Sequence, residues 1–277
     1  MVAACYPRVS GRHHMGSEIH ISLSASCLLQ PLPRQQSPIA LLDVPRYVAE
    51  ELEVRGIQIP VQMIRQQTPQ TLERLRDEAD RAQCPCLVLY RDEPLDFVAD
   101  GEKSAQVLRE MGKRARLLGC AEVAVRVANI ATASAQIAPL MKAALDGLQR
   151  FEVNLLIRPS EDPCDQPDAV IDLVRKIGGF HIGAMPSFAN AGATGDAQQS
   201  LRKLIPYSLA VEATVTSLSK AGVPEDESFD AHIDMLVQLG FSNKLSIDWR
   251  GGGNWAQAVQ GVRAHMMKKL GQGDPVT

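Results

Sequence analysis

Eight short apolar runs of strand-forming residues alternate with amphipathic stretches of helical periodicity along most of this chain. Such alternation is typical of βα units, in which parallel strands lie side by side and helices cover them. The expected strands are Ile19–Leu23, Ile57–Met63, Cys86–Tyr90, Glu122–Val127, Val153–Ile157, His181–Ala184, Ser208–Val211 and Lys244–Ile247. The sequence therefore predicts a parallel sheet with helices packed against it.

Helix start and stop signals follow several of these strands. Asp43 is a candidate N-cap for the helix behind the first strand. Thr68, which is followed directly by a proline, gives the same kind of start after the second strand. Gly119 stands in the C′ position behind a helix predicted over Ser104–Leu118. These signals support one helix after each strand.

Two features favour a closed barrel over an open sheet. The segment after the first strand, ASCLLQPLPRQQSP, contains no glycine-rich phosphate loop, and no GxxxxGK[ST] motif occurs in the chain. The chain has 277 residues, of which 45% are hydrophobic, so it is long enough to bury one large core. We expect an α/β fold, a (β/α)8 TIM barrel, as a single domain over residues 18–270. Residues 1–17 are expected to form a disordered leader, and residues 271–277 a short tail.

Composition argues against several classes of protein. The net charge is −3, and no cluster of lysine and arginine with interleaved aromatic residues stands out, so no nucleic-acid partner is expected. No stretch reaches the roughly 20 apolar residues that a membrane-spanning helix needs, and no signal-peptide pattern is seen. The six cysteines have no zinc-site or disulfide spacing. We therefore expect a cytoplasmic protein without a membrane partner.

The C-terminal ends of the strands are the place to look for function, because the loops of a barrel converge there. The polar residues at these ends are Gln62, Arg65, Tyr90, Arg91, Asp92, Arg126, Asn129, Arg158, Ser160, Glu161, Ser187, Asn190, Glu212, Asp248, Trp249 and Arg250. The set is rich in arginine, whose planar guanidinium suits carboxylate and phosphate oxygens. Two interpretations stay open: a pocket for an anionic sugar or acid, or a set of structural salt bridges that closes the barrel top.

Several segments resemble the xylose-isomerase-like sugar phosphate isomerase/epimerase family. They are DGEKSAQVLREMGKRARLLGCAEVAVRV, VNLLIRPSEDPCDQPDAVIDLVRKIGGFHIGAMPSFANA, LRKLIPYSLAVEATV and HIDMLVQLGFSNKLSIDWRGGGNWAQAVQGVRAHM. The resemblance implies a TIM barrel, a carbohydrate-type ligand and a role in carbohydrate metabolism. It also implies a divalent cation that binds two sugar oxygens while nearby groups move a proton between adjacent carbons.

The family's metal ligands map onto altered residues in this chain. The acid on strand five falls on Arg158, the Asp after strand six on Ser187, and the His beyond it on Asn190. The position on strand seven falls on Glu212, and the Glu on strand eight on Asp248. Of the residues that the resemblance implies, only these last two are plausible ligands for magnesium or manganese, which prefer several oxygen ligands.

The arginine at the strand-five position is the most informative of these changes. A fixed positive charge at Arg158 would repel a metal ion and would form hydrogen-bonded pairs with Asp248 or Glu212. The further acid expected on strand two falls near Gln62. We therefore predict no metal or other cofactor, with a divalent cation such as Mn or Mg as the alternative. Arginines beside a carboxylate are also expected to lower its pKa, which weakens it as a base.

Three functional hypotheses follow. The first is a divergent isomerase/epimerase-like barrel that binds a sugar or sugar-acid ligand, with metal-dependent isomerase activity lost or altered. In it, the ligand-binding residues are Arg126, Arg158, Ser187, Asn190 and Arg250, and the candidate catalytic residues are Glu212 and Asp248. The second is an active metal-dependent sugar isomerase or epimerase with a rearranged site, and the third is a non-catalytic binding or scaffold protein. These hypotheses leave open whether the chain is an enzyme. A homodimer is a candidate for its oligomeric state.

Overall fold

The computed structural model describes residues 19–31 and 37–272. The leader expected over residues 1–17 and residues 273–277 of the expected tail lie outside the described residues. The strands are β1 (His20–Ser24), β2 (Ile57–Pro60), β3 (Cys86–Leu95), β4 (Glu122–Val127), β5 (Asn154–Ile157), β6 (Ile182–Ala184), β7 (Ala210–Val215) and β8 (Lys244–Trp249).

Helices follow the strands along the chain. They are α1 (Val44–Glu50), α2 (Val61–Ile64), α3 (Pro69–Arg81), α4 (Gly101–Leu118), α5 (Ile130–Gln149), α6 (Pro167–Ile177), α7 (Phe188–Ala193), α8 (Ala197–Leu204), α9 (Phe229–Gln238) and α10 (Trp255–Lys269). Three short 3-10 helices accompany them: η1 (Ala25–Leu29), η2 (Leu41–Asp43) and η3 (Ile205–Tyr207). None of the described helices is both long and apolar enough to cross a membrane.

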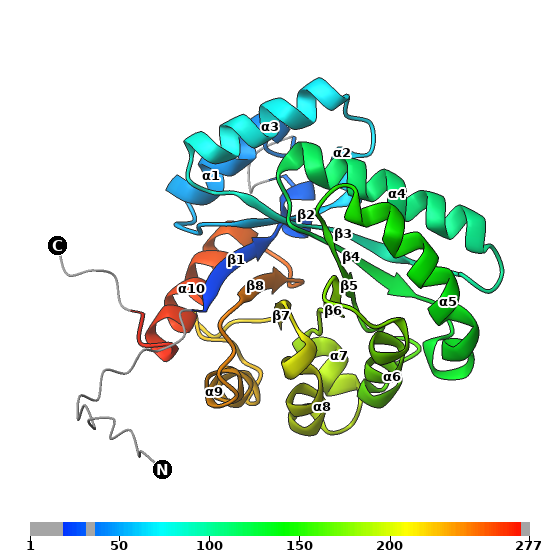
Figure 1. The fold of residues 1–277 in the computed structure, drawn as a ribbon. Helices are drawn as coiled ribbons and strands as arrows, with labels where there is room; N and C mark the ends of the chain where they lie inside the picture. Colours follow the sequence, from blue (N-terminus) through cyan, green and yellow to red (C-terminus); the bar gives the residue numbers. More distant parts are fainter. Residues whose placement is uncertain (1–18, 32–36, 273–277) are drawn as a thin grey trace, which may run out of the picture.

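The eight strands form one parallel sheet in the order β6-β5-β4-β3-β2-β1-β8-β7. Isolated parallel bridges join its two edges, at Ala184–Ser208 and at Ser187–Glu212. The Glu212 backbone N–H donates to the Pro186 carbonyl at 2.9 Å across the same seam. The sheet thus closes on itself, and the helices surround it (Figure 1). This confirms the predicted (β/α)8 barrel.

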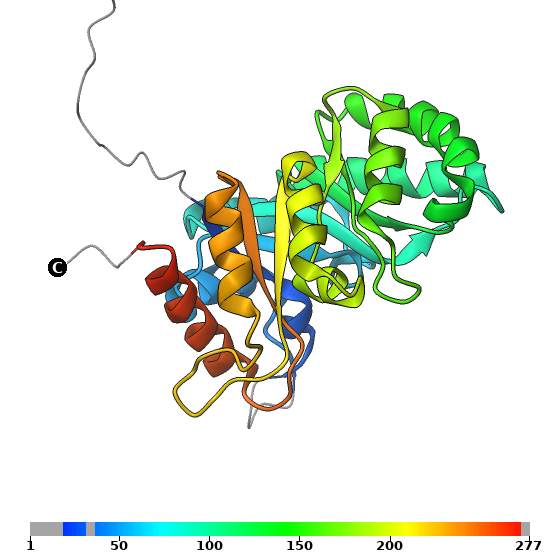
Figure 2. The same ribbon diagram turned by 90° about the horizontal axis from the view of Figure 1, so that it is seen from below.

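Alternate residues of each strand point outward and inward, as the two-residue repeat of a strand requires. Outward-facing apolar residues pack under the helices in one large core. Six inward-facing residues form a separate cluster inside the barrel: Val88, Tyr90, Ala124, Leu156, Met185 and Ala210. Around β7 and β8, α8, α9 and α10 lie next to one another (Figure 2). Side chains therefore fill the barrel interior, so a site inside the barrel has to lie at one of its ends.

Local sequence signals explain several helix ends. Thr68 Oγ1 accepts a hydrogen bond from the Thr71 backbone N–H at 3.2 Å, which confirms it as the N-cap of α3. Gly119 has φ of 76° and ends α4 as predicted. Asp43 precedes α1 but its side chain makes no capping hydrogen bond.

Three predicted strands have clearly different bounds in the structure. The third runs on to Leu95 instead of ending at Tyr90. The second ends at Pro60 rather than Met63, because the chain turns directly into the four-residue helix α2. Proline lacks the N–H that a longer strand would need for its ladder. The seventh strand spans Ala210–Val215 rather than Ser208–Val211, so Glu212 lies inside the strand and not at its end.

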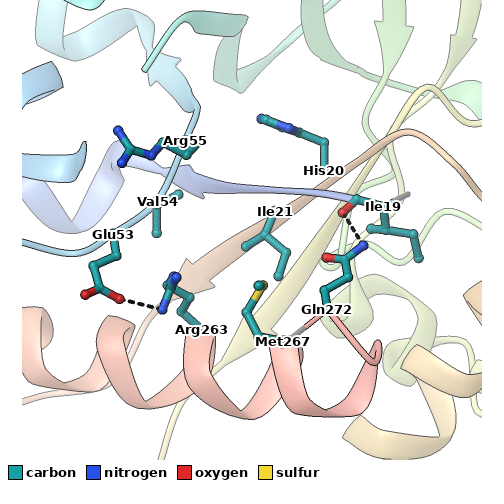
Figure 3. A pocket seen from close by; sticks show the side chains of 9 residues that line it. All are labelled: Ile19, His20, Ile21, Glu53, Val54, Arg55, Arg263, Met267 and Gln272. Atoms are coloured by element: carbon teal, nitrogen blue, oxygen red, sulfur yellow. Dashed lines mark hydrogen bonds and ion pairs between the residues drawn. The ribbon is translucent and has the colours of Figure 1, made fainter. Parts of the chain in front are cut away.

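A cavity of about 250 Å³ lies at the opposite, N-terminal end of the strands, between β1 and α10 (Figure 3). Its polar side chains make structural contacts. The Arg263 guanidinium lies 2.7 Å from the Glu53 carboxylate, and the Gln272 side-chain amide donates to the Ile19 carbonyl at 3.1 Å. The first contact joins α10 to the segment before β2, and the second joins the residues after α10 to the start of β1.

Candidate active site

Arg158 lies at the centre of the C-terminal rim, directly after β5, and is 3% exposed. Its Nη2 donates to both carboxylate oxygens of Glu212, at 2.9 and 3.0 Å. Its Nη1 donates to Asp92 Oδ1 at 2.7 Å and to the Arg91 carbonyl at 3.3 Å. The guanidinium carbon lies 4.5 Å from the centre of the Tyr90 ring, so a cation–π contact holds the group from one face. The predicted pairing with Glu212 is confirmed.

The charges of this cluster oppose the cost of burial. Burial alone would lower the pKa of the Arg158 guanidinium, but the negative charges of Glu212 and Asp92 outweigh it and raise that pKa. Burial raises the pKa of the Glu212 carboxyl, against the attraction of Arg158 and with added repulsion from Asp248. The neighbouring arginines lower the pKa of Glu212, as expected, but desolvation is the larger effect, so the net change of this pKa is upward.

A second ion-pair chain runs along the rim beside the first. Arg250 Nε donates to Asp248 Oδ2 at 2.7 Å, and its Nη1 donates to Glu161 Oε2 at 2.7 Å. Thr214 Oγ1 also donates to Asp248 Oδ2, at 3.3 Å. Arg126 reaches the other oxygen of Glu161 at 3.5 Å. Burial would raise the pKa of Glu161, but its hydrogen bond to Arg250 and the charges of the two arginines lower it.

A cavity of about 300 Å³ opens between the ion pairs of Arg158 and those of Arg250. Its lining residues are Ser26, Tyr90, Asp92, Arg126, Arg158, Asp248 and Arg250. Arg126 is the least engaged of the three arginines, because its one ion pair is long, at 3.5 Å. Its buried Nε, like that of Arg158, has no hydrogen-bond partner in the described part of the chain. The cavity therefore offers a cation with unused donors.

Other predicted site residues make structural contacts outside this cavity. Ser187 Oγ accepts from the Asn190 backbone N–H at 2.9 Å and so caps α7. The Asn190 side chain is buried and donates to the Ser160 carbonyl at 2.6 Å. Glu212 is covered by Arg158 and does not line the cavity, whereas Asp248 does. The structure thus brings Arg126, Arg158, Asp248 and Arg250 together around one space.

Two residues of this region were not identified by their sequence positions. Asp92 was only one of many polar residues at strand ends, and its pairing with Arg158 depends on β3 running on to Leu95. Gln58, rather than the exposed Gln62, is the buried glutamine of β2, and both polar atoms of its side chain lack a hydrogen-bond partner among the described residues. Alternation along β2 places Gln58 inside the barrel, and this signal was available in the sequence.

The carboxylates of the rim do not fit a divalent cation. Within residues 19–31 and 37–272, no group of three or more His, Cys, Asp and Glu side chains is placed to hold a metal ion. Arg158 binds Glu212 and Asp92, and Arg250 binds Asp248, so guanidinium groups stand where a cation would need carboxylate oxygens. Magnesium and manganese require several oxygen ligands in a regular geometry.

Comparisons by sequence give no relative: no family model matches the chain, and no curated protein matches it. Solved structures do match. An L-ribulose 3-epimerase aligns with a TM-score of 0.71 at 14% identity, covering 92% of this chain and 95% of that one. The 3-keto-D-glucoside 4-epimerase of E. coli aligns with a TM-score of 0.70 at 11% identity, covering 91% and 100%. A xylose isomerase domain protein from Planctomyces limnophilus aligns with a TM-score of 0.66 at 14% identity, covering 94% and 100%.

These likenesses define the class of fold. The chain has the barrel fold of xylose-isomerase-like sugar isomerases and epimerases, as its segments predicted. At 11–14% identity the comparison shows the fold alone. The chemistry of this chain therefore depends on the residues of its own rim.

Proposed function

We propose that this barrel binds an anionic sugar derivative in the rim cavity, and that Arg158 takes the place of a divalent cation. Metal-dependent isomerase chemistry is then lost or altered in this chain. Several of the matching structures are named as sugar isomerases or epimerases, which supports a carbohydrate-type ligand. The arginine at position 158 and its neighbours at the rim favour a ligand that carries negative charge over a neutral sugar.

The observation that carries the proposal is the contact of one guanidinium with two carboxylates. Arg158 lies 2.9 and 3.0 Å from the Glu212 oxygens and 2.7 Å from Asp92. The Arg158 guanidinium is therefore already the counter-ion of both carboxylates. Two like unit charges about 4 Å apart repel by about 4 kcal/mol near a protein surface, and a divalent ion would meet twice that repulsion.

The lining of the cavity favours a negative ligand. Three arginines and two carboxylates face it, and Arg126 has a donor without a partner among the described residues. Arginine binds carboxylate and phosphate groups through paired, charge-assisted hydrogen bonds. Ser26 and Asp92 can serve the hydroxyl groups of a sugar, because together they offer both donors and acceptors.

A second candidate function is that of a metal-free enzyme, and the position of Asp248 favours it. Asp248 lines the cavity, and both of its side-chain hydrogen bonds go to Oδ2, which leaves Oδ1 without one in the described part of the chain. A carboxylate oxygen free to meet a ligand is what proton abstraction requires. Glu212 is the weaker candidate, because both of its oxygens bind Arg158.

Thermal unfolding in the presence of ligands tests the proposal. Glucuronate and glucose 6-phosphate are expected to raise the melting temperature, whereas neutral glucose is not, because only a ligand that binds the native state stabilises it. Arg126→Gln should remove most of this effect. Arg150→Gln, at an exposed position after α5, is the matched control and should keep it. Equal shifts with glucose, or none with either anion, would contradict the proposal.

A further inference from the structure

A second concave site lies outside the barrel, on the flank of α4. Its cavity measures about 230 Å³ and is separate from the rim cavity, with which it shares no lining residue. The residues of α4 that line it are Lys103, Gln106, Val107, Glu110, Met111 and Arg114. They recur at intervals of three and four, so they form one face of the helix. Val61 and Arg65, at α2 and directly after it, and Arg91 of β3 complete the lining.

The short length of α2 explains why this face of α4 is open. The helix ends at Ile64 after four residues, and the chain continues to α3, which also packs against α4. All three helices lie along the upper side of the sheet in Figure 1. The apolar floor of the groove consists of Val61 and Val107, which are half-buried, and of Met111, which is 3% exposed and belongs to the core beneath.

Positive charge surrounds this floor. Four cationic side chains and one carboxylate line the groove, although the whole chain has a net charge of −3. The carboxylate, Glu110, is paired with Lys113 at 2.7 Å. Lys103 and Arg65 have no ion pair among the described residues, so their charges are available to a ligand.

Two of the cations are held in place by the backbone. Arg114 Nη1 donates to the Ile64 carbonyl at 2.6 Å and its Nη2 to the Arg65 carbonyl at 3.3 Å, which closes the end of α2. Arg91 Nε donates to the Glu93 carbonyl at 3.0 Å. Groups fixed in this way lose little freedom when a ligand binds, which favours binding.

We propose that this groove is a binding site for a small carboxylate with an apolar body. The apolar floor would cover the body, and Lys103 and Arg65 would hold the negative group at the edge. The volume is below the roughly 300–1,000 Å³ typical of sites for drug-sized ligands, so the ligand is a small one. The proposal does not depend on the function proposed for the rim.

Calorimetric titration with octanoate tests this site. Octanoate is expected to bind, acetate to bind at least about tenfold more weakly because it lacks the apolar body, and octylammonium not to bind. The variant Lys103→Glu/Arg65→Glu should weaken octanoate binding by at least about tenfold, since it reverses the charge at the groove edge.

Two control variants show whether octanoate binds in this groove or elsewhere on the protein. Lys142→Glu/Arg150→Glu makes the same charge change at exposed positions of α5 and its end, and should leave octanoate binding unchanged. Arg126→Gln, in the rim cavity, should also leave it unchanged, whatever it does to sugar anions. The proposal is overturned if octanoate does not bind at millimolar concentration, if octylammonium binds equally well, or if Arg126→Gln rather than the groove variant removes binding.

Discussion

At the scale of single residues, Arg158 decides how the rim is organised. Its position after β5 could be read from the sequence, and so could its pairing with a carboxylate, because a buried guanidinium requires one. The choice of Asp92 as second partner could not be read, since it depends on how far β3 extends and how the neighbouring strands are staggered. Asp248, the other expected partner of Arg158, is bound by Arg250 instead.

Removal of the Arg158 charge is expected to destabilise the protein strongly. Arg158→Met leaves Glu212 buried without its counter-ion, and breaking a buried pair in this way costs about 3–5 kcal/mol. Burial raises the pKa of Glu212, so protonation at lower pH should relieve part of the loss. Urea unfolding at several pH values measures this. Arg158→Lys, which keeps a charge, should lose less, and a deficit that grows as the pH falls would contradict the argument.

The same position tests the metal hypothesis. Arg158→Glu is expected to gain bound divalent metal, because it removes the fixed charge and adds a carboxylate beside Glu212 and Asp92. Metal content is measured on wild type and variant purified from the same manganese-supplemented medium without chelator. Arg158→Gln, which removes the charge but adds no anionic ligand, is the control. A full equivalent of bound metal in the wild type would contradict the metal hypothesis and would favour an active metal-dependent isomerase or epimerase.

The Glu161 carboxyl gives a pH prediction with a definite sign. The pKa of Glu161 is lowered in the folded protein. Its contribution to the free energy of unfolding is therefore fully present above the ordinary glutamate pKa, and it is lost as the pH falls through the lowered pKa. Glu161→Gln should therefore be less stable than wild type at neutral pH, by about 1 kcal/mol or less because the side chain is a quarter exposed. The difference should vanish in strong acid. Denaturant midpoints for both proteins, compared across pH, give the result.

At the scale of elements, start and stop signals were more reliable than strand ends. Thr68 and Gly119 act within one helical turn, so the sequence predicts them directly. The end of β2 and the start of β7 depend on where neighbouring strands can still pair, which local sequence does not reveal. The groove on α4 follows from the early end of β2, because the residues that continue the predicted strand form the short helix α2.

The cap of α3 provides the test at this scale. Thr68→Ala is expected to lower the free energy of unfolding by about 1 kcal/mol, because the Thr71 N–H loses its side-chain acceptor. Thr68→Ser keeps an acceptor at the same position and should lose much less. Chemical denaturation of the three proteins measures the difference, and an equal loss in both variants would show that the capping hydrogen bond is not the cause.

At the scale of the whole molecule, the barrel is held least firmly where it closes. Seven strand pairs form ladders, of which β2–β3 and β3–β4 contain a register shift, whereas β6 and β7 are joined only by an isolated bridge at Ala184–Ser208 and by the Ser187–Glu212 bridge just beyond β6. β6 is also the shortest of the described strands, with three residues. Closure itself could be predicted from the number of βα units, whereas the weakness of this one seam could not. The seam lies beside Arg158 and Glu212, so its integrity also positions the rim.

Gly183 of β6 tests how much the seam matters. A Cβ at this position would lie 2.8 Å from the Tyr207 carbonyl oxygen, which belongs to the chain leading into β7. Backbone atoms cannot move aside as a flexible side chain can, so Gly183→Ala should cost about 1–3 kcal/mol of stability. Gly192→Ala, where an added Cβ meets nothing within 4 Å in helix α7, is the matched control and should be neutral or slightly stabilising. Hydrogen exchange should report faster opening of β6 and β7 in Gly183→Ala than in the control, because the strain acts on their shared edge. Uniform acceleration across all eight strands would instead mean that the barrel opens as one unit and that the seam is no weaker than the rest.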